Sequence, residues 1–184
     1  MKLPFSLRAW LPGAVISCLL ASGAAFAADH AALERDARAA LSKLTSTVPA
    51  AKSLSGSAAA VLVFPKITKA GLGVGGQYGD GVLFKGGKVA GYYNTSGASY
   101  GLQAGAQQFG YAMFMMNDKA VSALGANEGF EVGVRPSVVV VDEGKAKTMT
   151  TTTAKDDIYA FIFGQKGLMA GLGIQGNKIT RLKE

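Results

Sequence analysis

The stretch VLVFPKITKAGLGVGGQYGDGVLF, residues 61–84, decides the fold of this chain. Its apolar start is followed by glycine at every second position, at Gly71, Gly73 and Gly75. Because successive side chains of a strand point to opposite faces, one face here is bare backbone and the other carries Leu72 and Val74. A bare face allows another backbone, a helix or a ligand to approach closely. The pattern therefore predicts a strand that is packed tightly on its glycine side.

A second glycine-rich stretch near residue 170 repeats this pattern, and both stretches contain G-x-G-x-x-G. A dinucleotide-binding turn of that form needs a helix after the glycines and an acidic residue about twenty positions later. After Gly76 the chain has further glycines, which break helices. The residues about twenty positions later are Tyr92–Asn94, and none of them is acidic. We therefore predict no cofactor. We interpret the glycines of both stretches as structural residues of a curved sheet: Gly71, Gly73, Gly75, Gly171 and Gly173.

Residues 1–27 have the features of a secretory signal peptide. Lys2 and Arg8 form a basic region, an apolar run follows from residue 9 to 20, and Ala25-Phe26-Ala27 is an A-x-A cleavage site. Cleavage before Ala28 would leave one domain, residues 28–184. The expected location is the periplasm or cell envelope, or outside the cell.

Cys18 is the only cysteine, and it has two interpretations. It is an ordinary residue of the apolar region, lost with the signal peptide, or it carries the lipid of a membrane-anchored lipoprotein. A lipoprotein signal usually has leucine three residues before the cysteine, whereas this chain has Val15. The A-x-A site favours the first interpretation. Neither disulfides nor thiolate chemistry would then be available to the exported protein.

The remaining pattern predicts an α+β fold with an N-terminal helix over about 28–48 and one short central helix, 119–124, capped by Asn117-Asp118. Lys85-Gly86-Gly87-Lys88 has the composition of a hairpin turn. Strands are predicted at residues 58–64, 82–84, 89–93, 100–116, 130–134, 137–141, 147–153, 158–163, 168–174 and 178–182. Short strands with glycine turns predict a curved antiparallel sheet over about 58–182 that closes into a sandwich or barrel.

The sequence offers little for catalysis or metal binding. His30, the only histidine, lies close to the predicted mature N-terminus, where chains fray, so no Ser-His-Asp or Cys-His site can be assembled around it. The acidic pairs at 142–143 and 156–157 are adjacent residues, which point to opposite faces of a strand. No close set of His and Cys ligands suits zinc. We expect a protein that is not an enzyme and that holds no metal.

The charge of the chain is compatible with an anionic partner. There are 19 basic and 12 acidic residues, so loss of Lys2 and Arg8 leaves a net charge of +5. This modest excess suits phospholipid head groups. Four lysines lie beside the predicted glycine turns and are candidate head-group contacts: Lys66, Lys69, Lys85 and Lys88. Nucleic acid is not an expected partner.

Three long segments together resemble the SYLF domain family. They are VLVFPKITKAGLGVGGQYGDGVL at 61–83, GYYNTSGASYGLQAGAQQFGYAMFMMNDKAVSAL at 91–124 and IYAFIFGQKGLMAGLGIQGNKITRL at 158–182. With the strands between them, the resemblance covers nearly all of residues 52–182. Fungal and animal members bind phosphoinositide membranes, and some bind actin filaments. Bacterial members resemble exported, envelope-associated proteins.

The chain departs from the eukaryotic members in two places. They tend to have Trp-Ser-x-Pro where this chain has residues 91–94, GYYN, and Gly-Pro where it has residues 137–141, SVVVV. Predicted export also places the protein where there is no actin, so actin is not an expected partner. The resemblance implies a non-catalytic envelope protein that binds anionic lipid, at a membrane surface or in a small apolar cleft. The alternative is a structural or protein-interaction module without a small ligand.

Overall fold

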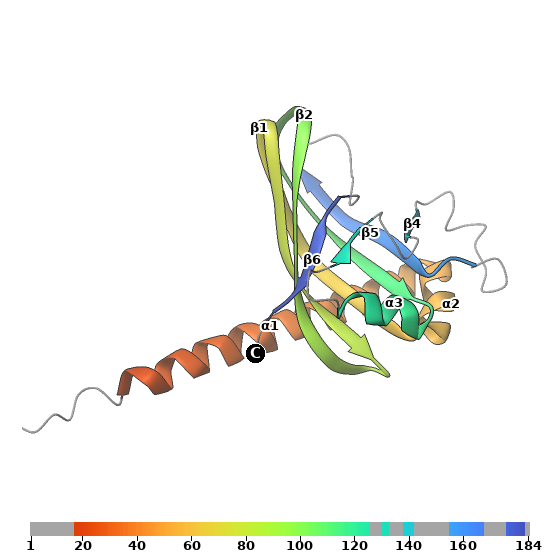
Figure 1. The fold of residues 1–184 in the computed structure, drawn as a ribbon, viewed down its shortest axis with the longest axis horizontal. Helices are drawn as coiled ribbons and strands as arrows, with labels where there is room; N and C mark the ends of the chain where they lie inside the picture. Colours follow the sequence, from red (N-terminus) through yellow and green to blue (C-terminus); the bar gives the residue numbers. More distant parts are fainter. Residues whose placement is uncertain (1–16, 126–129, 133–137, 142–154, 168–175, 183–184) are drawn as a thin grey trace, which may run out of the picture. The chain divides into compact units, whose positions relative to one another are not determined.

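The computed structural model describes residues 17–125, 130–132, 138–141, 155–167 and 176–182 (Figure 1). The side chains of residues 17–28, 73, 99–104 and 167 are also outside this description. The chain divides into two compact units, residues 1–32 and residues 33–184. The strands predicted at 147–153 and 168–174, with Gly171 and Gly173, lie outside the described residues.

Two helices precede the sheet. Helix α1 runs from Ser17 to Thr47, so it begins before the predicted start and ends close to the predicted end. Pro49 directly follows the predicted helix, and it is the first residue of a second helix, α2, Pro49–Ser57. Proline suits a first helical position, because its missing N–H would have no partner there. The sequence interpretation did not predict α2.

Strands β1 (Ala60–Lys85) and β2 (Lys88–Met115) form a long antiparallel hairpin. Its turn has the predicted location, and Gly86 and Gly87 have φ values of 57° and 76°. A type I′ turn requires positive φ at both central residues, which glycine adopts without strain. The two strands are longer than predicted. The predicted strands at 58–64 and 82–84 are parts of one strand, because the glycine-rich segment between them also pairs with β2.

Strand β1 folds back on itself around residue 73. A Cβ atom on Gly71 would collide with the backbone of Gly75, and one on Gly79 would lie 2.6 Å from the Lys66 carbonyl oxygen. These contacts join residues at similar distances on either side of the fold, so the two halves of β1 stack face to face. The bare glycine face is therefore where one half of the strand meets the backbone of the other.

The bend also changes the pairing between β1 and β2. Leu72 pairs with Ala104, but Val74 pairs with Tyr100, so β2 contributes two more residues than β1 at this point. Extra residues on one strand of a pair bend it and increase its twist. Gly105, beside the bend in β2, has a φ of 127°. The predicted bend of residues 100–116 at a glycine is therefore confirmed.

The other strands pair along β2. They are β3 (Phe130–Glu131), β4 (Val138–Val141), β5 (Ile158–Gly167) and β6 (Lys178–Arg181). The sheet has six described strands in the order β3-β6-β2-β5-β4, with β1 on β2. Strand β6 pairs with residues 93–96 of β2, before the bend, and β5 pairs with residues 107–115, after it.

One pair corrects the all-antiparallel prediction, because β4 and β5 are parallel. Residues 142–157 connect these strands. Parallel neighbours need a connection of about a dozen residues or more, and this one is long enough. No local pattern in either strand distinguishes the two orientations.

Both faces of the sheet are buried. One face packs against α1 and α2, through Ala37, Leu44, Ala51, Leu54, Val61, Val63, Phe114 and Phe161 among others. The other face encloses a second core with Leu62, Phe64, Ile67, Tyr111, Met113, Phe130 and Ile179. Helix α3 (Asp118–Ala123) covers part of it, and its Ala120 amide donates to Asn117 Oδ1 at 2.9 Å, the predicted cap. The predicted α+β class with a curved sheet is confirmed, and the sheet forms a half-barrel.

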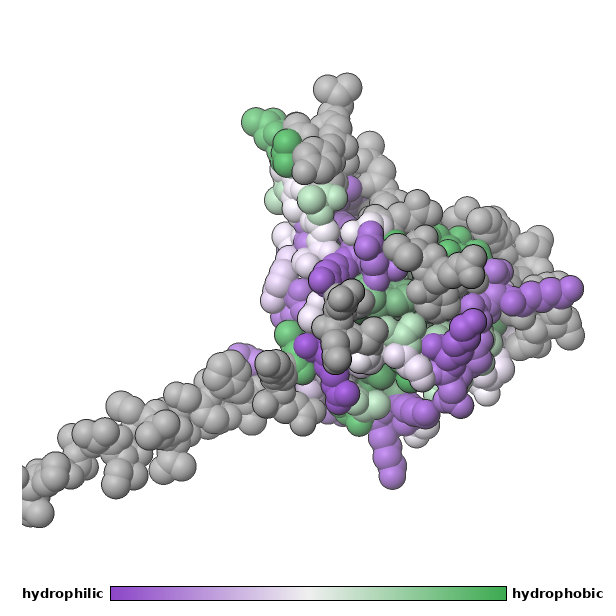
Figure 2. Space-filling model, in the orientation of Figure 1, coloured by the Kyte–Doolittle hydropathy of each residue, from purple (hydrophilic) through white to green (hydrophobic). Residues whose placement is uncertain are grey.

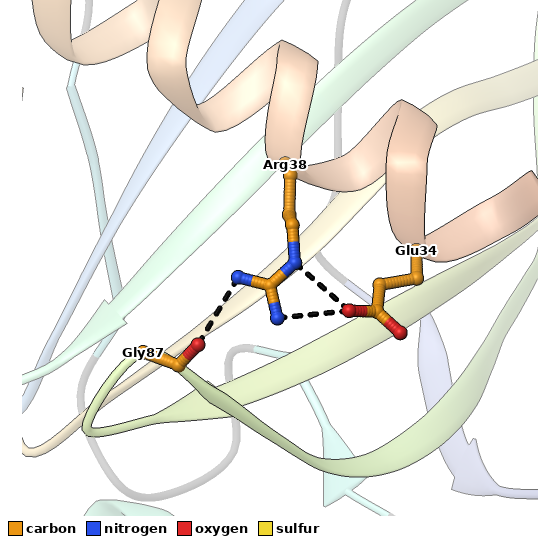
Figure 3. A network of polar contacts seen from close by, with 3 residues as sticks. All are labelled: Glu34, Arg38 and Gly87. Carbon is orange, nitrogen blue, oxygen red and sulfur yellow. Dashed lines mark hydrogen bonds and ion pairs between the residues drawn. The ribbon is translucent and has the colours of Figure 1, made fainter. Parts of the chain in front are cut away.

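Helix α1 holds the hairpin turn in place (Figure 3). Arg38 Nη1 donates to the Gly87 carbonyl oxygen at 3.1 Å, and Arg38 Nε donates to Glu34 Oε1 at 2.9 Å. The guanidinium carbon also lies 4.8 Å from the centre of the Phe84 ring. The turn with Lys85 and Lys88 is thus attached to the helix.

Candidate functional site

The structure separates the four predicted lysines into two pairs. Lys66 and Lys69 lie in the first half of β1, a few residues before the bend at residue 73. Lys85 and Lys88 flank the hairpin turn at the far end of the same strand. Lys85 Nζ lies 3.2 Å from the carboxylate of Asp118 in α3. The four lysines therefore do not form one patch.

Lys66 and Lys69 were predicted to lie beside a turn, and this part of the prediction is wrong. Both are inside β1: Lys69 pairs with Gln107 of β2, whereas Lys66 lies at a bulge between the paired residues Phe64 and Ile67. Lys66 is exposed, whereas only 4% of Lys69 is accessible to solvent. Burial takes Lys69 out of the set of lysines that a head group could reach from outside.

The bend in β1 displays apolar side chains. Leu72 is 82% exposed, Val74 62% and Tyr78 58%, and these are the large apolar residues that the described part of the chain leaves exposed. Figure 2 shows hydrophobic surface at the end of the β1–β2 ribbon, near where Figure 1 labels these strands. The glycine face points into the fold, so the alternate residues are left to point outward. We call Leu72 and Val74 the apolar tip.

Two further exposed lysines, absent from the sequence prediction, lie near the apolar tip. Lys166 of β5 pairs with Gln108, which also pairs with Thr68 of β1. Lys178 of β6 pairs with Ser96, which also pairs with Tyr78. Lys166 therefore lies at the same height along the strands as Thr68, which is four residues before Leu72. Lys178 lies at the same height as Tyr78, which is four residues after Val74. No local signal could have identified them, because only strand pairing brings residues 166 and 178 close to residue 72.

The second half of the chain matches the model of a known protein family. Residues 96–184 match the model of a family described as "Ysc84: Las17-binding protein actin regulator". This match agrees with the resemblance of the chain to the SYLF (Ysc84) family. No curated protein matches the chain. The match contains most of β2, all of α3 and strands β3 to β6, whereas the apolar tip precedes it.

The match to this family supports a module that binds lipid or interacts with other proteins. The family is one of binding domains and not a known family of enzymes. Within the described residues, no group of three or more His, Cys, Asp or Glu side chains could hold a metal ion. In the same part of the chain, no helix is both long enough and apolar enough to cross a membrane.

Five polar side chains of the described residues are buried in the sheet and the loop before β6. They are Lys69, Gln77, Thr95, Gln107 and Asn177, which are at most 7% exposed. The Gln77 amide nitrogen donates to Asn177 Oδ1, across residues a hundred positions apart. The Tyr111 hydroxyl donates to Thr95 Oγ1 at 3.0 Å. These hydrogen bonds satisfy some of the polar groups that would otherwise be costly to bury, while Gln107 Oε1 and Asn177 Nδ2 have no hydrogen-bond partner among the described residues.

Tyr111 predicts a dependence of stability on alkaline pH. Burial raises the pKa of its phenol well above the usual value, while the hydrogen bond to Thr95 partly opposes this. Below about pH 10 the phenol is protonated in both states and adds no pH dependence. Above that pH the unfolded state loses a proton that the folded state keeps. Stability should therefore fall with rising pH, by up to about 1.4 kcal/mol per pH unit from this group.

Urea unfolding at about pH 9 and about pH 11, with Tyr111→Phe as the comparison, measures this contribution. The variant should lose less stability between the two pH values than the parent protein. Tyr78 and Tyr93 also have raised pKa values and titrate in both proteins, so the difference isolates Tyr111. Equal losses would show that the Tyr111 phenol ionises as readily in the folded state as in the unfolded one.

Proposed function

We propose that this chain is a non-catalytic, exported envelope protein whose SYLF domain binds anionic lipid at a membrane surface. The match of residues 96–184 to a SYLF family model is the observation that carries the proposal. The predicted signal peptide supports export, through Ala25-Phe26-Ala27. The family description names Las17 binding and actin regulation, but an exported protein would not meet actin, so we do not extend that activity to this chain.

Exposed lysines on both halves of the folded ribbon supply the attraction. Lys66, Lys166 and Lys178 are exposed and come from three different strands, β1, β5 and β6. Each lysine near an anionic surface contributes about 1 kcal/mol, and the effect fades within a Debye length of about 8 Å at physiological salt. Lys166 and Lys178 take the place of the buried Lys69 in the set that we assign to head groups.

Co-sedimentation with vesicles tests the proposal. The protein should bind vesicles that contain phosphatidylglycerol and should not bind vesicles of phosphatidylcholine alone. Raising the salt from about 0.1 M to about 1 M shortens the Debye length from about 10 Å to about 3 Å, and binding should weaken accordingly. The triple variant Lys66→Glu, Lys166→Glu, Lys178→Glu should bind at least about tenfold more weakly.

A matched triple variant controls for net charge. Lys43, Lys52 and Lys119 are exposed on α1, α2 and α3, so their change to glutamate alters the net charge by the same amount at other places. This control should retain most of the binding. Equal loss in both triple variants would contradict an assignment to these strands. An absence of vesicle binding at every lipid composition would contradict lipid binding and favour the alternative, a protein-interaction module.

A further inference from the structure

Neither the bend nor the core explains why the residues of the exposed apolar tip are apolar. A tight bend needs residues that reverse the backbone, and glycine, asparagine, aspartate and serine do this best. The glycines of β1 provide the close contact, since Gly71 and Gly75 touch. Leu72 and Val74 stand between them and contribute little to the core, at 82% and 62% exposed. Neighbouring apolar side chains exposed in this way commonly mark an interaction site.

The size of the apolar tip favours a bilayer over a protein partner. A stable protein–protein interface buries about 800 Å² on each partner. Among the described side chains, Leu72, Val74 and Tyr78 are the three exposed apolar ones at this end of the ribbon, which is a small area for such an interface. A bilayer needs no matching shape, and apolar side chains at its surface are buried about 5–10 Å deep, at the boundary of head groups and acyl chains.

The charged residues behind the apolar tip lie at the right level for head groups. Lys166 and Lys178 are level with residues four positions behind the tip, or about 13 Å along a strand. Tyr78 stands at the same level as Lys178, and tyrosine favours the boundary between lipid and water. Glu131 pairs with Lys178, and Asp80 acts on Tyr78, so carboxylates offset part of the positive charge. Charge alone therefore gives weak attachment, and apolar insertion adds to it.

We propose that the apolar tip, Leu72 and Val74, inserts into the surface of an anionic bilayer. Tyr78 lies at the boundary with water, and Lys66, Lys166 and Lys178 contact the phosphates of the head groups. This inference rests on the proposed function and adds the part of the chain that enters the lipid. It places the insertion in residues that precede the matched segment 96–184.

Vesicle binding by tip variants tests the insertion. The double variant Leu72→Ser, Val74→Ser should bind phosphatidylglycerol vesicles about tenfold more weakly or worse, because two apolar side chains no longer leave water. Its circular dichroism spectrum and melting temperature should match those of the parent protein, since both side chains are exposed. The double variant Leu72→Met, Val74→Ile keeps the apolar character and should keep the binding.

A tryptophan at the tip gives a second measurement that does not depend on the amount of binding. Trp10 is the only tryptophan of the chain and precedes Ala28, so the exported protein that begins at Ala28 has no tryptophan background in any fluorescence variant. Leu72→Trp should then shift to shorter wavelength and be quenched by brominated lipids. The control Lys52→Trp, at an exposed position in α2, should show neither change.

The outcomes separate the insertion from lipid binding itself. Failure of the parent protein to bind any vesicle would overturn both. If the parent binds but the serine variant binds equally well and Leu72→Trp is not quenched, lipid binding stands and insertion of the tip is overturned. If the serine variant instead converts a dimer to a monomer in size-exclusion chromatography, with no quenching of Leu72→Trp, the tip joins two copies of the chain, which also overturns the insertion.

Discussion

Replacing Gly79 by alanine is expected to destabilise the protein strongly, whereas the same change at Gly76 should have almost no effect. A Cβ atom on Gly79 would lie 2.6 Å from the Lys66 carbonyl oxygen and 3.1 Å from the Ile67 Cα atom. Both are backbone atoms, so the two halves of β1 must move apart. Overpacking of this kind costs about 1–3 kcal/mol, and valine should cost more than alanine because it adds two methyl groups.

Gly76 is a matched control within the same strand. A Cβ atom there would have the Gly97 carbonyl oxygen at 3.8 Å as its nearest neighbour, which is ordinary contact. Both glycines have backbone angles that other residues adopt, since neither has a positive φ. Urea unfolding gives the comparison through the midpoint at an unchanged slope. Similar midpoints for Gly79→Ala and Gly76→Ala would show that the halves of β1 are not in close contact.

Replacing Phe114 by alanine is expected to cost about 3–5 kcal/mol, a large part of the stability of a typical domain. Phe114 of β2 is completely buried on the sheet face that α1 and α2 cover. Its ring meets the edge of the Phe161 ring, with centroids 5.4 Å apart. The change removes this contact and leaves a cavity between the sheet and the helices.

The variant Phe114→Leu controls for the size of the cavity. Leucine fills most of the space but lacks the ring, so this change should cost clearly less than alanine. Thermal unfolding of the three proteins gives the order directly, because a loss of 1 kcal/mol lowers the melting temperature of a domain of this size by about 2–4 °C. An alanine variant that melts like the parent protein would mean that this face is not tightly packed.

Local chemistry explains which elements the sequence predicted well. The turn at Gly86 and Gly87 needs positive φ, and glycine supplies it wherever the rest of the chain lies. The cap of α3 needs only Asn117 and an amide three residues later. These features depend on a few neighbouring residues, so their position could be read from the chain.

Long-range pairing explains what was missed. The orientation of β4 against β5 depends on a connection of residues 142–157, and neither strand encodes it in its own residues. Helix α2 was missed because Pro49 signals the end of one helix as well as the start of another. The glycines of residues 71–81 were interpreted as part of a curved sheet, but the fold-back at residue 73 was not predicted, since glycine alone does not say whether a strand curves or folds over.

The sequence by itself determined the α+β class, the hairpin turn and the need for close backbone contact along the glycine face. Only the tertiary structure decided what that contact is and what it leaves outside. Stacking of the two halves of β1 buries Lys69 and exposes Leu72 and Val74. Pairing with β2 brings Lys166 and Lys178 towards them from strands that are distant in the chain. The physical reason is that φ preferences and caps act over a few residues, whereas exposure depends on which distant strands pair and in which register.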